Sequence, residues 1–287
     1  MIYLKTFTLL DEEQEYNLAR FRERRRIFNN QYPLQLFYVK EFQDIEFDNI
    51  TIFYGGNGSG KTTLLNIIAD KLLAERKSVI DKGSYFKLYV DECQFEMSSE
   101  EPIEVKVIAS DDVFEYLLDI RAINSGVNKN KERLSKSYME FKYNSSGTNF
   151  DTYEELKNSY ESKHMTMSKF VRQRLGNNNL IEQSNGESAL MFWEKEIQEN
   201  SIYLLDEPEN SLSAENQLKL KQFIEDSARF YNCQFIISTH SPFLLNLKGA
   251  KIYDLDDVPV KVKKWTELAN VKVYYDFFKE HENEFKD

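Results

Sequence analysis

The sequence predicts an α/β fold built around a mainly parallel sheet. Short apolar segments that suit buried strands alternate with segments of helical spacing, which is typical of parallel strands joined by helical crossovers. Residues 50–54 form such a strand segment before a predicted helix at 62–73, and residues 202–205 form another before a predicted helix at 214–231. The first strand leads into a glycine-rich loop and the second into a pair of acids, so both strand ends carry residues suited to binding.

Further elements complete the predicted sheet and its surroundings. Strands are expected at residues 2–9, 34–39, 44–47, 235–238 and 252–255, and helices at 11–29, 153–163, 168–175 and 187–199. The inner face of the helix at 214–231 is expected to carry Leu218, Phe223, Ile224 and Ala228. A charged tail without regular structure is expected at 279–287.

The middle of the chain has a different composition. From about residue 98 to residue 183, polar and charged residues dominate, and the stretches 124–137 and 144–149 are rich in Asn or Ser. We interpret this region as a largely helical lobe with exposed connections. Because strands and helices resume after it, the prediction is a single domain over residues 1–287 with the lobe inserted at approximately 98–183.

Composition restricts the class of protein. Of the 287 residues, 41% are hydrophobic and 30% are charged, which suits a soluble chain with a large core. The uncharged segment 232–247 has 16 residues, fewer than the roughly 20 that a membrane span requires. No signal peptide is visible, and Cys93 and Cys233 form no CxxC pair. We therefore expect a cytoplasmic protein with no membrane partner, no disulfide and no zinc site.

The net charge of −11 indicates that the surface as a whole is not adapted to nucleic acid. One local exception is the basic run RFRERRR at residues 20–26. Its arginines could pair with acids such as Glu12, Glu13 and Glu23 on a solvated helix face, or they could contact phosphate groups. The sequence leaves DNA open as a partner.

The glycine-rich loop has the chemistry of a phosphate site. The segment GGNGSGKTT fits the pattern G-x-x-x-x-G-K-[ST] between a predicted strand and helix. Glycines allow main-chain amides to wrap phosphates closely, and the positive end of the helix points at them. Lys61 supplies a charge for the outer phosphates of ATP, and the Thr62 hydroxyl can bind Mg²⁺. The predicted binding residues are Gly55, Gly56, Asn57, Gly58, Ser59, Gly60, Lys61, Thr62 and Thr63.

The acids after the strand at 202–205 suit a metal and a water molecule. A buried parallel strand delivers its C-terminal residues to the ligand crevice. We expect Asp206 to hold Mg²⁺, directly or through water, and Glu207 to orient or deprotonate the attacking water. An ordinary strand with acids at its solvated end is the alternative, and the nearby phosphate loop makes it the weaker one.

Two further segments extend this pattern. Ser184, Gly186 and Glu187 lie in QSNGESAL, where a hydroxyl and helix-start amides could meet a phosphate. Ser-Asn-Gly is also a common turn and helix cap, so this motif is weak by itself. His240 lies in STHSP, directly after the strand at 235–238.

In this order, the four segments resemble those of soluble ABC ATPases related to DNA-repair and chromosome-maintenance proteins, and of small bacterial predicted ATPases of the AAA type. The resemblance covers about residues 51–73 and 183–255. It implies a P-loop NTPase with an ABC-ATPase head and an inserted helical lobe, in which His240 contacts the terminal phosphate. It also implies a homodimer in which Ser184, Gly186 and Glu187 of one chain reach the ATP bound at Lys61 of the other.

Two family features have no single assignment. The glutamine that couples the sheet to the helical lobe has two candidates, Gln94 and Gln173. The aromatic side chain that stacks on adenine also has two, Phe37 and Tyr38, for which packing in the core is the other interpretation.

The resemblance implies an enzyme that converts ATP and water to ADP and phosphate, with Lys61, Glu207 and His240 as catalytic residues. It would act as a nucleotide-dependent dimerising switch and not as a membrane transporter. One alternative is an accessory, nucleotide-gated interaction module for a separate effector protein, in a defence or DNA-related process. A P-loop kinase for a small molecule is a further alternative.

Overall fold

The computed structural model describes residues 1–22, 31–78, 83, 85–98, 103–143, 153–175, 185–210 and 212–286. The chain divides into two units, which are described separately. One comprises Met1–Phe114 and Ala189–Asp287, and the other comprises Glu115–Ser188. The first contains every strand of the described chain, and the second is helical.

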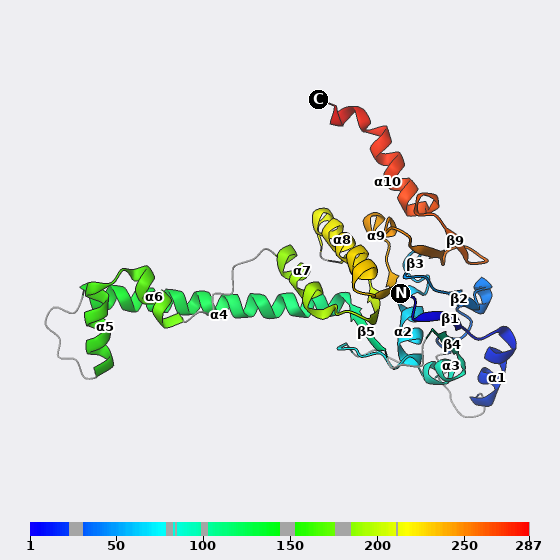
Figure 1. The fold of residues 1–287 in the computed structure, drawn as a ribbon, viewed down its shortest axis with the longest axis horizontal. Helices are drawn as coiled ribbons and strands as arrows, with labels where there is room; N and C mark the ends of the chain where they lie inside the picture. Colours follow the sequence, from blue (N-terminus) through cyan, green and yellow to red (C-terminus); the bar gives the residue numbers. More distant parts are fainter. Residues whose placement is uncertain are drawn as a thin grey trace. The chain divides into compact units, whose positions relative to one another are not determined.

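A six-stranded sheet forms the centre of the first unit (Figure 1). In spatial order its strands are β5 (Glu104–Ala109), β6 (Ser201–Asp206), β7 (Gln234–Ser238), β3 (Ile50–Tyr54), β8 (Lys251–Asp254) and β9 (Lys261–Lys263). All neighbours pair in parallel except β8 and β9. The predicted α/β fold with a mainly parallel sheet is therefore confirmed. Strands β3 and β7 are buried along their whole length, which explains their mainly apolar residues.

A smaller antiparallel sheet packs in the same unit. It contains β2 (Asp44–Glu46), β1 (Leu4–Thr8) and β4 (Gln94–Met97) in that spatial order. The helix α2 (Lys61–Lys71) has an almost continuous buried face that contacts strands of the large sheet. Apolar side chains from both sheets and α2 join one hydrophobic core. This core fixes the strand end from which α2 begins.

Helices cover both faces of the large sheet. The crossover from β3 to β5 and the crossover from β6 to β7 run in opposite directions along the sheet, so right-handed connections place α2 and α8 (Ala214–Phe230) on opposite faces (Figure 1). The remaining helices of this unit are α1 (Glu12–Arg22), α3 (Phe86–Glu92), α9 (Pro242–Leu245) and α10 (Ala269–Glu280), with short 3₁₀ turns at Tyr38–Lys40, Trp265–Glu267 and Glu282–Phe285. No described helix is long and apolar enough to cross a membrane.

The second unit is built from helices. The 34-residue α4 (Ser110–Tyr143) leads into it from the first unit, α5 (Tyr153–His164) and α6 (Met167–Leu175) follow, and α7 (Asn185–Glu196) returns. Tyr138 and Phe170 pack edge to face with ring centroids 5.4 Å apart, and the Arg174 guanidinium lies 3.6 Å above the Phe170 ring. The contact between Tyr138 and Phe170 joins α4 to α6.

Several predicted elements were wrong. Residues 34–39 form turns and a 3₁₀ helix in place of a strand, and residues 124–137 lie inside α4 instead of forming an exposed connection. Strand β5 lies within the range that the sequence assigns to the lobe. Leu218 is 49% exposed, and Leu220 occupies the inner face of α8 in its place. Regular structure continues in α10 to Glu280 and in a 3₁₀ turn at Glu282–Phe285, beyond the predicted start of the tail.

Candidate active site

Three strands of the large sheet end at the same edge and bring the predicted residues together. The register places Phe53 of β3 and Asp206 of β6 beside Ser238 of β7. Because the strands are parallel, the residues that follow each strand leave the sheet side by side. The glycine-rich loop, Glu207 and His240 therefore gather at this edge.

The loop between β3 and α2 is shaped by its glycines. Gly60 has a φ of 102° and stands at the N-cap of α2, a conformation that favours glycine. A Cβ atom on Gly55 would lie 2.5 Å from Ser59 Oγ, so this position cannot accept a side chain without displacing Ser59. The helix begins at Lys61, and its first amides open towards the loop. This is the geometry of an anion site at a helix N-terminus.

Lys61 lies across the loop and is 5% exposed. Its ammonium group donates hydrogen bonds to the carbonyl oxygens of Gly55 at 2.8 Å and Gly56 at 3.1 Å. Glu207 Oε1 lies 3.9 Å from the same nitrogen. The two carbonyl oxygens thus hold the ammonium group over the loop. An incoming phosphate could replace them as its hydrogen-bond acceptors.

Asp206 and Thr62 face one another across the strand end. Thr62 Oγ1 donates a hydrogen bond to Asp206 Oδ1 over 3.1 Å. Burial raises the pKa of the Asp206 carboxyl, and the Thr62 hydroxyl acts against this rise. Hard oxygen ligands of this kind suit Mg²⁺. The described residues contain no group of three or more His, Cys, Asp or Glu side chains able to hold a metal.

Glu207 is held in a strained but well-supported position. Its φ is 48°, a left-handed conformation that is uncommon for a residue with a side chain. Its amide donates to the Ser238 carbonyl oxygen over 2.9 Å, and Asn210 Nδ2 donates to its Oε2 over 3.0 Å. Its Oε1 lies 3.8 Å from Nδ1 of the half-exposed His240. The side chain therefore stands between Lys61 and His240.

A second glutamate, which the sequence analysis did not identify as a site residue, fixes the turn that carries His240. Glu209 is buried, and its Oε1 accepts hydrogen bonds from Thr239 Oγ1 at 2.6 Å, His240 N at 3.0 Å and Ser241 N at 3.2 Å. Burial raises the pKa of this carboxyl, while those donors favour its charged form. Asn270, at the start of α10, also donates to the His240 carbonyl oxygen over 3.0 Å. The only hint in the sequence is the position of Glu209 directly after Asp206-Glu207-Pro208.

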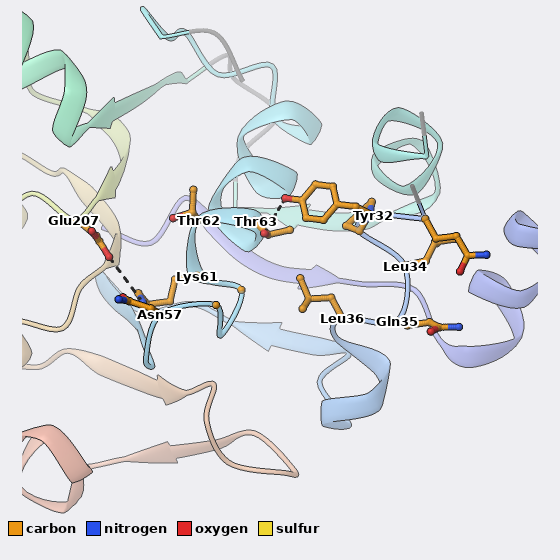
Figure 2. A pocket seen from close by; sticks show the side chains of 13 residues that line it. Tyr32, Leu34, Gln35, Leu36, Asn57, Lys61, Thr62, Thr63 and Glu207 are labelled. Atoms are coloured by element: carbon orange, nitrogen blue, oxygen red, sulfur yellow. Dashed lines mark hydrogen bonds and ion pairs between the residues drawn. The ribbon is translucent and has the colours of Figure 1, made fainter. Parts of the chain in front are cut away.

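A cavity of about 650 Å³ opens beside the phosphate loop (Figure 2). Asn57, Thr62 and Glu207 are among the residues on one side, and the segment 31–36 forms another wall. The Tyr32 hydroxyl donates to Thr63 Oγ1 over 2.8 Å, which ties this wall to α2. The sequence did not reveal this wall, because residues 34–39 were predicted to form a strand. Pro33 and the polar residues around it are typical of a turn and were the available signal.

The remaining predicted residues lie elsewhere. Ser184 is outside the described residues, and Gly186 and Glu187 lie in the first turn of α7. Phe37 is fully buried beneath Gly60 and packs in the core. Gln94 lies on β4 of the small sheet, and Gln173 lies in α6. Most of the basic run at 20–26 falls outside the described residues.

Comparisons with known proteins place this site in a family. A family model described as an AAA domain matches residues 34–256. No curated protein matches the chain. The fold is similar to the SMC head domain from Thermotoga maritima, with a TM-score of 0.39, 12% identity, and coverage of 92% of this chain and 99% of that chain.

A second similar structure is the dimeric, post-hydrolysis state of an ATP-binding cassette bound to ADP and Pi. Its TM-score is 0.34, its identity is 13%, and the match covers 77% of this chain and 88% of that chain. The family match covers most of the chain, and its range includes the phosphate loop, both acids at the end of β6, and His240. The chain belongs to the AAA-domain family.

Proposed function

We propose that this chain binds ATP with Mg²⁺ and hydrolyses it to ADP and phosphate. One observation carries the proposal: Lys61, Thr62, Asp206, Glu207 and His240 lie at a single sheet edge beside a cavity of about 650 Å³. A cation, a pair of metal-binding oxygens, a carboxylate and an imidazole are the groups that phosphoryl transfer to water uses. Their convergence from three separate strands is unlike a chance cluster of surface charges.

The triphosphate would lie along the phosphate loop, against the amides that open α2. Lys61 would exchange its bonds to the carbonyl oxygens of Gly55 and Gly56 for bonds to phosphate oxygens. This exchange is favourable, because a hydrogen bond from an ammonium group to a charged phosphate oxygen is stronger than one to a neutral carbonyl oxygen. The segment 31–36 would then face the nucleoside.

Thr62 and Asp206 would hold Mg²⁺ between them. When bound, Mg²⁺ neutralises charge on the phosphates and stabilises the charge that develops on the leaving group. Burial raises the pKa of Asp206 and so favours its protonated form. Binding of Mg²⁺ requires the ionised carboxylate, so the ion would have the opposite effect and lower this pKa.

Glu207 would orient the attacking water and accept its proton. The water oxygen forms the new bond to the γ-phosphorus, and the bond from that phosphorus to the bridging oxygen of ADP breaks. Asn210 and the Ser238 carbonyl fix Glu207 for this role. His240, on the turn held by Glu209, would donate a hydrogen bond to the terminal phosphate.

The reaction would control a homodimer. In this proposal, Ser184, Gly186 and Glu187 of a second copy close over the ATP bound at Lys61, and hydrolysis releases them. ATP can shift this equilibrium because it would contact both chains only in the closed state. The chain thereby acts as a nucleotide-dependent switch.

The variant Glu207→Gln tests both parts of the proposal. It keeps the shape of the side chain and removes the base, so ATP should bind with Mg²⁺ and remain uncleaved. We expect the mass of a dimer by sedimentation with ATP and the mass of a monomer without it, and Lys61→Ala should remain monomeric under both conditions. A monomer with ATP bound contradicts the dimer, whereas absence of ATP binding contradicts the site itself.

A further inference from the structure

A buried carboxylate lies behind the wall of the cavity, outside the set of groups assigned above. Glu15 lies on the inward face of α1 and is 3% exposed, whereas Glu12 and Glu13 on the same helix are exposed. Burying a carboxylate is unfavourable unless hydrogen bonds stabilise it. The position of Glu15 therefore indicates a specific partner.

That partner is the main chain of the wall. Glu15 Oε2 accepts a hydrogen bond from the backbone N–H of Gln35 over 2.5 Å. Gln35 has a φ of 63°, a left-handed conformation that is unfavourable for a residue with a side chain. A hydrogen bond to a charged carboxylate is among the stronger ones that a backbone amide can make. It stabilises the loop in a conformation that Gln35 would not adopt readily by itself.

The residues on each side of Gln35 contact the phosphate loop. Leu36 packs so closely on Gly60 that its Cδ2 would lie 3.2 Å from a Cβ atom there, and Tyr32 is bonded to Thr63. Figure 2 shows Leu36 and the Tyr32 hydroxyl directed towards the phosphate loop and α2, and the Gln35 side chain directed away from Lys61. The hydrogen bond from the Gln35 amide to Glu15 thus holds the wall from behind, between the wall's contacts with Gly60 and Thr63.

We infer that Glu15 is a positioning residue for the nucleotide: its ionised carboxylate fixes the wall at 31–36 in the arrangement that receives the nucleoside. The inference rests on the proposed function, because it assumes that the cavity binds ATP. Glu15 touches no reacting atom and acts through Gln35 alone.

The surroundings of Glu15 make this device sensitive to pH. Burial raises the pKa of Glu15 to about 7, against the hydrogen bond from Gln35 and the influence of the Tyr89 hydroxyl. In the described chain, Tyr89 on α3 and Cys93 at its end are the titratable groups that interact with this carboxylate. Burial raises the pKa of both above the neutral range, so both are uncharged there. Glu15 is therefore the group of this cluster that changes charge near neutral pH.

The two consequences of ionisation have opposite signs. Because the folded chain holds the proton on Glu15 more tightly than the unfolded chain does, this group's contribution to stability falls as pH rises through the interval up to about 7. The hydrogen bond to Gln35 strengthens over the same interval, because a carboxylate is a better acceptor than a carboxylic acid. Affinity for the nucleotide should rise while this contribution to stability falls.

The variant Glu15→Gln separates positioning from folding. The measurement is the affinity for a fluorescent, non-hydrolysable ATP analogue with Mg²⁺ between about pH 6 and 8.5, with the melting temperature of the nucleotide-free protein. We expect the affinity of the unaltered chain to rise by about fivefold over this range, as a neutral acceptor becomes charged. Glu15→Gln should bind about fivefold more weakly at the upper end, with no such rise, and its melting temperature should not fall. Glu12→Gln, on the exposed face of α1, is the matched control and should follow the unaltered chain.

Two results overturn the inference alone. One is an unchanged affinity and pH profile in Glu15→Gln. The other is a parallel fall in affinity and melting temperature, which would mean that Glu15 serves the fold only. If the unaltered chain binds no ATP analogue at any pH, the proposed function fails and this inference fails with it. All other titratable groups are shared by the three proteins, so differences between their profiles report on the substituted residue.

Discussion

The ammonium group of Lys40 donates a hydrogen bond to the main-chain carbonyl oxygen of Ser59 over 2.7 Å. A second hydrogen bond, of 2.6 Å, reaches the carbonyl oxygen of Leu255, which directly follows β8. Partial burial lowers the pKa of Lys40, and Asp256 and Asp254 act against this effect. Lys40 thereby fastens the phosphate loop to a neighbouring strand end.

Lys40→Met should loosen this attachment. The variant keeps the length of the side chain and leaves two carbonyl oxygens without their donor, so we expect a loss of about 1–2 kcal/mol in the free energy of unfolding by denaturant. Affinity for ATP should fall as well, because the loop would no longer be held ready. Lys87→Met, at an exposed position on α3, is the control, and equal stability of the two variants would contradict this role.

Asp206→Asn should stabilise the nucleotide-free protein. Burial raises the pKa of Asp206, so the folded chain binds its proton more tightly than the unfolded chain, and the stability due to this group falls as pH rises above the ordinary range of an aspartate. Asparagine removes the partly buried charge and with it this loss. We expect a higher melting temperature at neutral pH without nucleotide and a smaller gain on adding ATP with Mg²⁺. A lower melting temperature without nucleotide would show that the carboxylate stabilises the fold.

Glu209→Ala should disrupt the turn that carries His240. The Thr239 hydroxyl and the amides of His240 and Ser241 would lose their common acceptor, and leaving such donors buried costs about 2–4 kcal/mol in the free energy of unfolding. Glu209→Gln retains an oxygen acceptor and should lose less. Denaturant unfolding measures both, and Glu215→Ala, at an exposed position in α8, serves as the control. A similar loss in the control and in Glu209→Ala would contradict the assignment.

Tyr32→Phe should weaken nucleotide binding with little effect on stability. The variant removes the hydroxyl that bonds to Thr63 and leaves the ring, whose stacking on Phe86 at 6.2 Å supports the wall. We expect the dissociation constant for ATP to rise about three- to tenfold, as for the loss of one neutral hydrogen bond. Titration calorimetry of this variant, beside the exposed-site control Tyr231→Phe, measures the effect. An unchanged constant would show that the wall does not need this bond.

The central strands could be predicted from the sequence because burial on both faces requires a continuous run of suitable residues. Residues 50–54 and 234–238 have such runs and stop at loop residues. Strand β5 was missed because Glu104 and Lys106 interrupt its apolar residues at the edge of the sheet, in a region of polar composition. The local pattern of apolar residues indicates how buried a strand is. An edge strand is less buried than a central one, so its pattern is harder to recognise.

Two errors have a common physical origin in tertiary packing. The alternation of Leu34, Leu36 and Tyr38 resembles a strand, yet a left-handed Gln35 breaks it, and Leu36 packs on Gly60 instead. The residues 124–137 resemble a loop in composition, yet Lys, Arg and Glu are good helix formers and the contact of Tyr138 with Phe170 stabilises α4. In both cases the packing partner, Gly60 for Leu36 and Phe170 for Tyr138, is distant in the sequence.

The sequence also indicates some parts of the site better than others. Asp206 and His240 could be placed at the ends of strands because each follows an apolar run, and Lys61 could be placed because it completes the glycine-rich pattern. Glu15 and Lys40 could not be found, because their partners are main-chain atoms of Gln35, Ser59 and Leu255 that only the folded chain brings near. Residues that support a site through the backbone leave no motif.

Phosphate release from ATP by the purified chain, with Mg²⁺ present, tests the central claim most directly. We predict steady hydrolysis by the unaltered chain, and a loss of about 100-fold or more in both Lys61→Ala and Glu207→Gln, since one lacks the phosphate cation and the other the base. Glu207→Gln should still bind ATP. Hydrolysis by Lys61→Ala at the rate of the unaltered chain would contradict the account.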